Sequence, residues 1–153
     1  MEDSSWKIYE AQLSDELLSR LIAFSADWEA ENSTYGYRKN ERSDIEGNRI
    51  FLAEMDGEIV GYLFGHPDKA KRAGSIMADE TPFFEIEELY VSPRCRCAGI
   101  GKALFRYAEQ QIKKTGIEFI MLSTATKNYK SILHFYIEEL GMDFWSARLF
   151  KKI

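Results

Sequence analysis

Residues 87–104 read Glu87-Glu88-Leu89-Tyr90-Val91-Ser92-Pro93-Arg94-Cys95-Arg96-Cys97-Ala98-Gly99-Ile100-Gly101-Lys102-Ala103-Leu104. The first residues are typical of a strand, and the glycines at 99 and 101 open a helical pattern behind a short loop. Glycine has no Cβ, so several backbone N–H groups at such a helix start can approach one anion. The helix dipole adds a partial charge of about +0.5. The segment therefore predicts a phosphate-binding loop, to which Arg96 or Lys102 could add a full charge.

Two common phosphate motifs do not fit these residues. A Walker loop would need glycine at position 96 and serine or threonine at 103, where the chain has Arg96 and Ala103. The dinucleotide fingerprint needs a third glycine where Leu104 stands. The remaining pattern is Arg-x-x-Gly-x-Gly, Arg96 to Gly101, after a strand that ends Leu-Tyr-Val.

The rest of the chain supplies strands and helices around this unit. Asp56-Gly57 joins two strands in a tight hairpin, and Gly141 suits the left-handed end of a helix. The residue patterns predict strands at 6–9, 49–55, 58–65, 83–91, 119–123 and 143–151, helices at 17–28 behind the N-cap Ser14, at 99–115 and at 129–140, and loops at 32–48 and 67–82. The first half of the chain has strands joined as hairpins, and the second half has a strand–helix–strand order. This order predicts one α/β domain over residues 1–153, with a central mixed and mostly antiparallel sheet and helices on both faces.

Composition excludes several classes of protein. The chain has 153 residues, of which 45% are hydrophobic and 29% charged, as expected for one globular domain. The net charge of −5 makes nucleic acid an unfavourable partner. No apolar run is long enough for a membrane span and the first residues do not read as a signal peptide, so we expect a cytoplasmic protein. Cys95 and Cys97 form no disulfide framework, and neither His66 nor His134 has ligand spacing to them, so we predict no metal site.

Taken together, these residues resemble the GNAT family of acetyl-CoA-dependent N-acetyltransferases. The resemblance is carried by the Arg96–Gly101 motif, by Leu89-Tyr90-Val91-x-Pro93 before it, and by Asn128, Phe135-Tyr136 and Gly141 after it. It implies a GNAT-like fold, acetyl-CoA as co-substrate and no metal. It covers most of the chain, because the family has the same order of elements.

The resemblance also implies roles for individual residues. The backbone around Leu89, Tyr90 and Val91 would pair with the pantetheine arm like an added strand, and Tyr136 would protonate the departing thiolate. The pyrophosphate would be held by the loop Arg96, Cys97, Ala98, Gly99, Ile100, Gly101 and Lys102, with Asn128 on the other side. The spacings from Asn128 to Tyr136 and from Tyr136 to Gly141 are each one residue longer than the family pattern. Either the helix contains a bulge or another residue takes one of these roles, and Tyr136 would then be a packed aromatic.

An amine acceptor also needs a base, because an unperturbed amine has a pKa of about 10 and its ammonium form cannot attack a thioester. Glu85, Glu87 and Glu88 lie on the strand beside the expected thioester. Alternation places Glu87 on the same face as Leu89 and Val91, unless a bulge changes the parity. We therefore prefer Glu87 as the base, with Glu88 or Glu85 binding the charge of the substrate; the alternative is a solvated strand face.

The acidic pair Glu87-Glu88 resembles that of the diamine and polyamine acetyltransferases. We expect transfer of acetyl to a primary amine of a small, cationic molecule, directly in a ternary complex and without a membrane or nucleic-acid partner. A protein or peptide amine, or a CoA-binding module without turnover, is the alternative. The sequence leaves a homodimer open.

Overall fold

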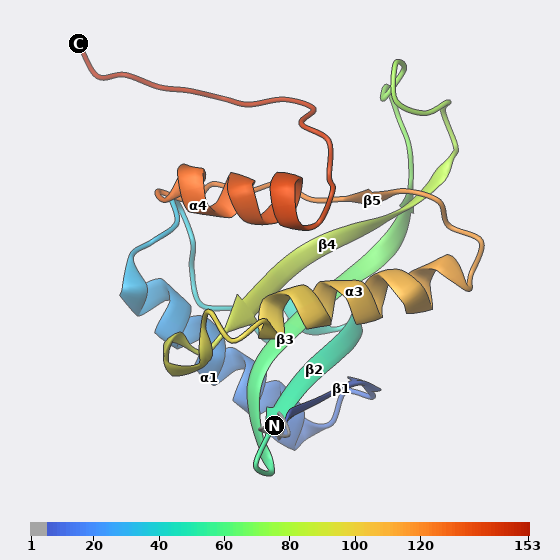
Figure 1. Cartoon of the computed structure of the whole chain (residues 1–153). Helices are drawn as coiled ribbons and strands as arrows, with labels where there is room; N and C mark the ends of the chain where they lie inside the picture. Colours follow the sequence, from blue (N-terminus) through green and yellow to red (C-terminus); the bar gives the residue numbers. More distant parts are fainter. Residues whose placement is uncertain (1–5) are drawn as a thin grey trace.

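The computed structural model describes residues 6–153, which build one sheet of five strands (Figure 1). The strands are β1 (Trp6–Ala11), β2 (Arg49–Met55), β3 (Glu58–Lys69), β4 (Pro82–Val91) and β5 (Ile120–Met121), in this order across the sheet. Neighbours from β1 to β4 pair antiparallel, and β5 pairs parallel to β4. The predicted mixed, mostly antiparallel α/β sheet is confirmed.

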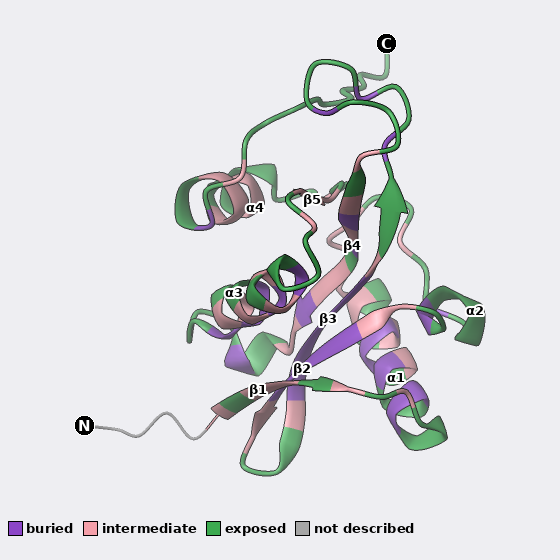
Figure 2. Cartoon of the chain, turned by 90° about the vertical axis from the view of Figure 1, so that its right-hand side faces the viewer, coloured by how far each residue is buried: buried purple, intermediate pink, exposed green. Residues whose placement is uncertain are grey.

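Helices cover both faces of this sheet (Figure 2). On one face lie α1 (Asp15–Glu31) and the single turn α2 (Arg42–Ile45); on the other lie α3 (Ile100–Lys113) and α4 (Tyr129–Leu133). The helix α1 begins as expected, because the Ser14 side chain accepts a hydrogen bond from the Leu17 N–H. Each face of the sheet has its own apolar core. The core under α1 contains Leu21 and Phe24, and the core under α3 contains Leu104 and Phe105.

The early hairpin forms as predicted, with Asp56 and Gly57 both at positive φ, 51° and 80°. The strand β3, however, runs to Lys69 and not only to residue 65. It passes through Pro67, which has no N–H to donate. The proline is tolerated because β2 ends opposite Gly65, so no strand remains on that side to need the missing donor.

The strand β4 contains a bulge at Glu87. Phe64 pairs with Glu88 but Gly65 pairs with Ile86, so Glu87 is an extra residue with no partner on β3. The strands approach so closely here that a Cβ on Gly65 would lie 2.1 Å from the Glu85 carbonyl oxygen. The expected shared face of Glu87 with Leu89 and Val91 is wrong, because the bulge reverses the alternation.

The last part of the chain differs most from expectation. The helix at 129–140 forms, but from His134 to Glu139 it is a π-helix (η2), in which the Leu140 N–H donates to the Phe135 carbonyl oxygen. The predicted strand at 143–151 is wrong: these residues form no strand and lie exposed. The edge strand β5 is only two residues long, and the segment does not pair with it.

Candidate active site

The site begins where β4 and β5 separate. The two strands pair only at Phe84 with Ile120 and at Glu85 with Met121. Beyond these pairs the chain after β5 meets the loop that follows α1, where Thr34 bridges Thr126 near the start of α4 (Figure 1). Within residues 6–153, one edge of β4 after residue 86 is therefore left without a neighbouring strand. An extended molecule can add to such an edge through main-chain hydrogen bonds.

The bare edge leads into the loop before α3. The turn η1 (Pro93–Cys95) is followed by Cys97 and Gly99 at positive φ, 66° and 84°. Among the described residues, the backbone N–H groups of 97–102 find no hydrogen-bond acceptor. A group of free amides at a helix start is a binding site for an anion, so the loop has the chemistry that the sequence predicts.

The charge of Arg96 is paired within the protein and is not directed at the anion-binding amides of 97–102. Its guanidinium pairs with both carboxylate oxygens of Glu31, at 2.6 and 3.1 Å, and its Nε donates to the Val91 carbonyl oxygen. Glu31 also accepts from the Tyr90 hydroxyl at 2.7 Å. Partial burial alone would raise the pKa of Glu31, but these hydrogen bonds lower it. No local sequence pattern signals this pair, because Glu31 ends a helix 65 residues earlier.

Of the three β4 glutamates, Glu88 is the most enclosed. It accepts hydrogen bonds from the hydroxyls of Tyr37 and Tyr62 and from the Asn40 amide, which reaches both of its oxygens. Burial raises the pKa of Glu88 and these donors oppose the rise. Because both oxygens already have protein partners, Glu88 anchors the loop between α1 and α2 to the sheet, and it is poorly suited to bind a substrate's charge.

Glu87, in contrast, is exposed and paired with a histidine. Its Oε1 lies 2.8 Å from the His66 Nε2, and the His66 Nδ1 lies 3.2 Å from the Pro67 carbonyl oxygen. Both neighbours accept hydrogen bonds, so the arrangement is satisfied when both ring nitrogens carry protons. Partial burial would lower the pKa of His66, but the two acceptors outweigh it and raise the pKa. Glu87 therefore forms an ion pair with His66 whenever that ring is protonated.

Glu85 is the glutamate without a partner. It is half-buried, and its side chain has no hydrogen bond to any described residue. Burial, followed by repulsion from the Glu87 carboxylate, raises the pKa of Glu85 to about 7, although His66 opposes the rise. A carboxyl group that titrates near neutral pH can accept a proton there and release it again. Glu85 also belongs to the last pair before β4 and β5 separate.

Comparisons with known proteins agree with this geometry. A family model described as the Acetyltransferase (GNAT) family matches residues 8–142. The chain belongs to the GNAT family. A mycothiol acetyltransferase of Acidothermus cellulolyticus is 28% identical over 115 residues, 72% of this chain and 35% of the relative. This chain therefore spans about a third of the length of that relative.

Several solved structures share the GNAT fold with this chain. An aminoglycoside acetyltransferase from an uncultured soil metagenomic sample, solved with trehalose, has a TM-score of 0.70 at 20% identity and covers 99% of this chain and 98% of its own. A protein named as a transcriptional regulator from Bacillus halodurans has a TM-score of 0.70 at 22% identity, covering 97% and 99%. The glucosamine-6-phosphate N-acetyltransferase of Arabidopsis thaliana has a TM-score of 0.61 at 18% identity, covering 96% and 97%.

The typical co-substrate of GNAT enzymes, acetyl-CoA, fits the residues present. Its pyrophosphate matches the free amides of 97–102, and its extended arm matches the bare edge of β4. The Val91 carbonyl oxygen already accepts a hydrogen bond from Arg96. A pantetheine arm that pairs with Val91 therefore shares this acceptor with Arg96 or displaces the Arg96 hydrogen bond.

Among residues 6–153 no group of three or more His, Cys, Asp or Glu could hold a metal ion. No helix in that range is long and apolar enough to cross a membrane.

The helix after β5 carries the remaining candidates. Asn128 is exposed at the start of α4. A π-helix spans His134–Glu139, so the bulged helix, one of the two explanations for the longer spacings around Tyr136, is present. The roles of Asn128 and Tyr136 stay predictions. The Tyr136 ring packs against Phe105 of α3, and burial raises the pKa of Tyr136 to about 12. The neighbouring Phe135 ring lies beside Gly101, where a Cβ would be 3.5 Å away.

Proposed function

We propose that this chain moves acetyl from acetyl-CoA to a primary amine of a small, cationic molecule by direct transfer. The observation that carries the proposal is the arrangement around one strand, β4. The loop after it holds the free amides of 97–102, and Glu85, which has no hydrogen-bond partner among the described residues, lies where β5 separates from it. Similar proteins named for mycothiol, aminoglycosides and glucosamine-6-phosphate support a small-molecule acceptor.

In this proposal the chain's own residues bind, orient and exchange protons. The amides of 97–102 hold the pyrophosphate, Asn128 supports it, and the backbone of Leu89 and Val91 pairs with the arm. Glu85 takes the proton of the incoming ammonium directly or through a water, replacing Glu87 in the role that the sequence favoured. Glu87 keeps the pKa of Glu85 high by repulsion. Acetyl-CoA, when bound, supplies the activated acetyl group, and a backbone N–H near Val91 stabilises the developing oxyanion.

The acceptor side of β4 is acidic. A hollow of about 380 Å³ lies between α2 and the bulge, and it is lined by Ser43, Asp44, Glu46, Gly47, Asn48, His66 and Glu87. Arg42 pairs with Glu46, and His66 pairs with Glu87 when its ring is protonated. The carboxylate of Asp44 and the exposure of the two pairs leave the hollow more favourable to a cation than to a neutral group. This charge supports a substrate with a second positive centre.

We expect kcat/KM for spermidine to exceed that for a primary amine with a neutral tail of equal length by about 10-fold or more, with a smaller ratio at high salt. Thiol release from acetyl-CoA measures both rates. Glu87→Gln should reduce the preference, whereas Glu109→Gln, on α3 at the other face, should not. Equal rates for the two amines in the wild-type protein would contradict the cationic acceptor.

Tyr136 is proposed as the acid that protonates the departing thiolate. Its hydroxyl has no hydrogen bond to a described residue, so Tyr136→Phe removes the proton without costing packing or stability. We expect kcat at saturating substrate to fall by about 100-fold, with an unchanged melting temperature. Tyr107→Phe, a partly buried tyrosine on the same α3–sheet core, is the control. Wild-type kcat in Tyr136→Phe would leave Tyr136 as a packed aromatic only.

A further inference from the structure

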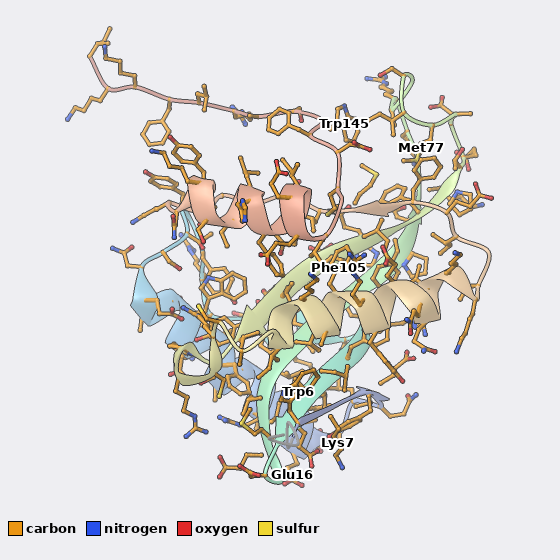
Figure 3. All side chains as sticks on the ribbon, viewed as in Figure 1. Trp6, Lys7, Glu16, Met77, Phe105 and Trp145 are labelled. Atoms are coloured by element: carbon orange, nitrogen blue, oxygen red, sulfur yellow. The ribbon has the colours of Figure 1, made fainter. Side chains whose placement is uncertain are left out.

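The end of α1 lies against the loop before α3, and side chains fill the space between them (Figure 3). The carboxylate of Glu31, the last residue of α1, accepts hydrogen bonds from two nitrogens of the Arg96 guanidinium and from the Tyr90 hydroxyl. The same guanidinium lies over the Tyr90 ring, 5.3 Å from its centroid, and its Nε donates to the Val91 carbonyl oxygen. One carboxylate thus joins α1, the end of β4 and the loop.

The end of α1 is a firm support for this contact. Trp28, three residues before Glu31, stacks on the Tyr90 ring with 5.3 Å between centroids and 18° between planes. The Trp28 Nε1 donates to the Thr34 hydroxyl, and Thr34 in turn bridges Thr126 in the chain after β5. The carboxylate therefore projects from a helix end that is packed on β4, whereas its partner guanidinium belongs to a loop.

The loop needs such a support because its backbone is strained. Cys97 has a φ of 66°, in the left-handed region that residues with a side chain rarely adopt. Cys97 and Ala98 take part in no backbone hydrogen bond with residues 6–153. The nearest polar contact that holds this stretch is the side chain of Arg96, directly before it. If Cys97 rotated back to negative φ, the N–H groups around it would no longer face one anion.

Glu31 could act on the co-substrate in two opposite ways. If it competed with the pyrophosphate for the guanidinium, its removal would free a positive charge and tighten binding. If it holds the loop, its removal would weaken binding. The contacts favour the second way, because all the nitrogens of the Arg96 guanidinium are engaged within the protein. A bidentate pair of this kind fixes the direction of the side chain as well as its charge.

We propose that Glu31 is a positioning residue for the co-substrate: through Arg96 it holds residues 96–99 in the conformation that presents the amides of 97–102 to the pyrophosphate of acetyl-CoA. The proposal rests on acetyl-CoA as the co-substrate in the proposed function. It is read from binding without an acceptor, so it does not depend on which amine is acetylated or on which residue is the base.

Isothermal titration calorimetry with acetyl-CoA and no acceptor tests the proposal. The Kd of Glu31→Gln should be about 10-fold above that of the wild-type protein, because the loop then spends only a fraction of its time in the binding conformation. Arg96→Gln should show the same rise, and the double variant no further rise, since each substitution removes the same contact. The matched control is Glu58→Gln, which breaks the exposed Arg94–Glu58 pair of the preceding turn η1 and should keep the wild-type Kd.

A second ligand separates the loop from general damage to the site. S-acetylpantetheine has the arm and the thioester but no pyrophosphate, so its Kd should be no higher in Glu31→Gln than in the wild-type protein. In turnover, KM for acetyl-CoA should rise in Glu31→Gln while kcat at saturation stays unchanged. Circular dichroism shows that each variant is folded, and the exposed position of Arg96 keeps Arg96→Gln available if Glu31→Gln does not fold.

The opposite results are equally specific. A Kd of Glu31→Gln for acetyl-CoA equal to or below that of the wild-type protein would overturn the proposal, and so would an equal weakening for acetyl-CoA and S-acetylpantetheine. A larger loss in Arg96→Gln than in Glu31→Gln would show that Arg96 itself contacts the pyrophosphate, which also overturns it. A wild-type protein that does not bind acetyl-CoA would overturn the proposed function together with this inference, whereas the other results leave the proposed function standing.

Discussion

Glu85→Gln is expected to lower kcat/KM for the amine acceptor by about 100- to 10,000-fold, the usual contribution of a general base. Glutamine has nearly the same size and cannot take the proton. The fold should not suffer, because the Glu85 side chain makes no hydrogen bond to any residue among 6–153. Since the pKa of Glu85 is raised in the folded protein, its ionised form destabilises the fold above neutral pH. The melting temperature of Glu85→Gln at pH 8 should therefore be equal to or higher than that of the wild-type protein.

The pH dependence separates Glu85 from its neighbours. A base with a pKa of about 7 works in its ionised form, so the wild-type rate should rise with pH through about 7. His66→Gln removes a positive neighbour that lowers the pKa of Glu85, so this limb should move to higher pH. A Glu85→Gln variant with wild-type kcat/KM, together with a large loss in Glu87→Gln, would return the role of base to Glu87.

Glu88→Ala should have the largest effect on stability. It leaves the Tyr37 and Tyr62 hydroxyls and the Asn40 amide without their shared acceptor. Unsatisfied donors of this kind cost about 1–3 kcal/mol each, partly relieved here by water, so we expect a loss of roughly 3 kcal/mol. For a domain of this size, that lowers the melting temperature by about 10 °C. Thermal unfolding followed by circular dichroism measures the shift.

Glu87→Ala is the matched control for that experiment. It removes a neighbouring carboxylate of the same strand, but one in an exposed pair worth about 0–1 kcal/mol. The melting temperature should change by only a few degrees. If Glu88→Ala keeps the wild-type melting temperature and loses turnover instead, then Glu88 acts on the substrate and not on the loop.

Local patterns account for the parts of the fold that the sequence predicts. Ser14 caps α1, Asp56-Gly57 forms the hairpin, and Gly99 adopts the positive φ before α3, each for a reason contained in a few neighbouring residues. Compared with the GNAT pattern, the longer spacings of Asn128, Tyr136 and Gly141 allowed a bulged helix as one of two explanations, and the π-helix is such a bulge. These features need no knowledge of the distant chain.

Long-range register accounts for what the sequence does not predict. The bulge at Glu87 depends on the approach of Gly65 from another strand, and it decides which glutamate faces which helix. The Arg96–Glu31 pair joins the loop before α3 to the end of α1, two segments far apart in the sequence. The segment 143–151 has the pattern of a strand, but a strand also needs a neighbouring ladder, and among the described residues this segment pairs with none.

The central claim is that amines accept acetyl at the gap between β4 and β5. Thiol release from acetyl-CoA, measured against polyamines, amino acids, aminoglycosides and short peptides with a no-acceptor blank, tests it most directly. We predict release well above the blank with polyamines or other small cationic amines, lowered by about 100-fold or more in Glu85→Gln. Release no higher than the blank with every small amine, from a protein that acetyl-CoA stabilises against heat, would contradict the claim.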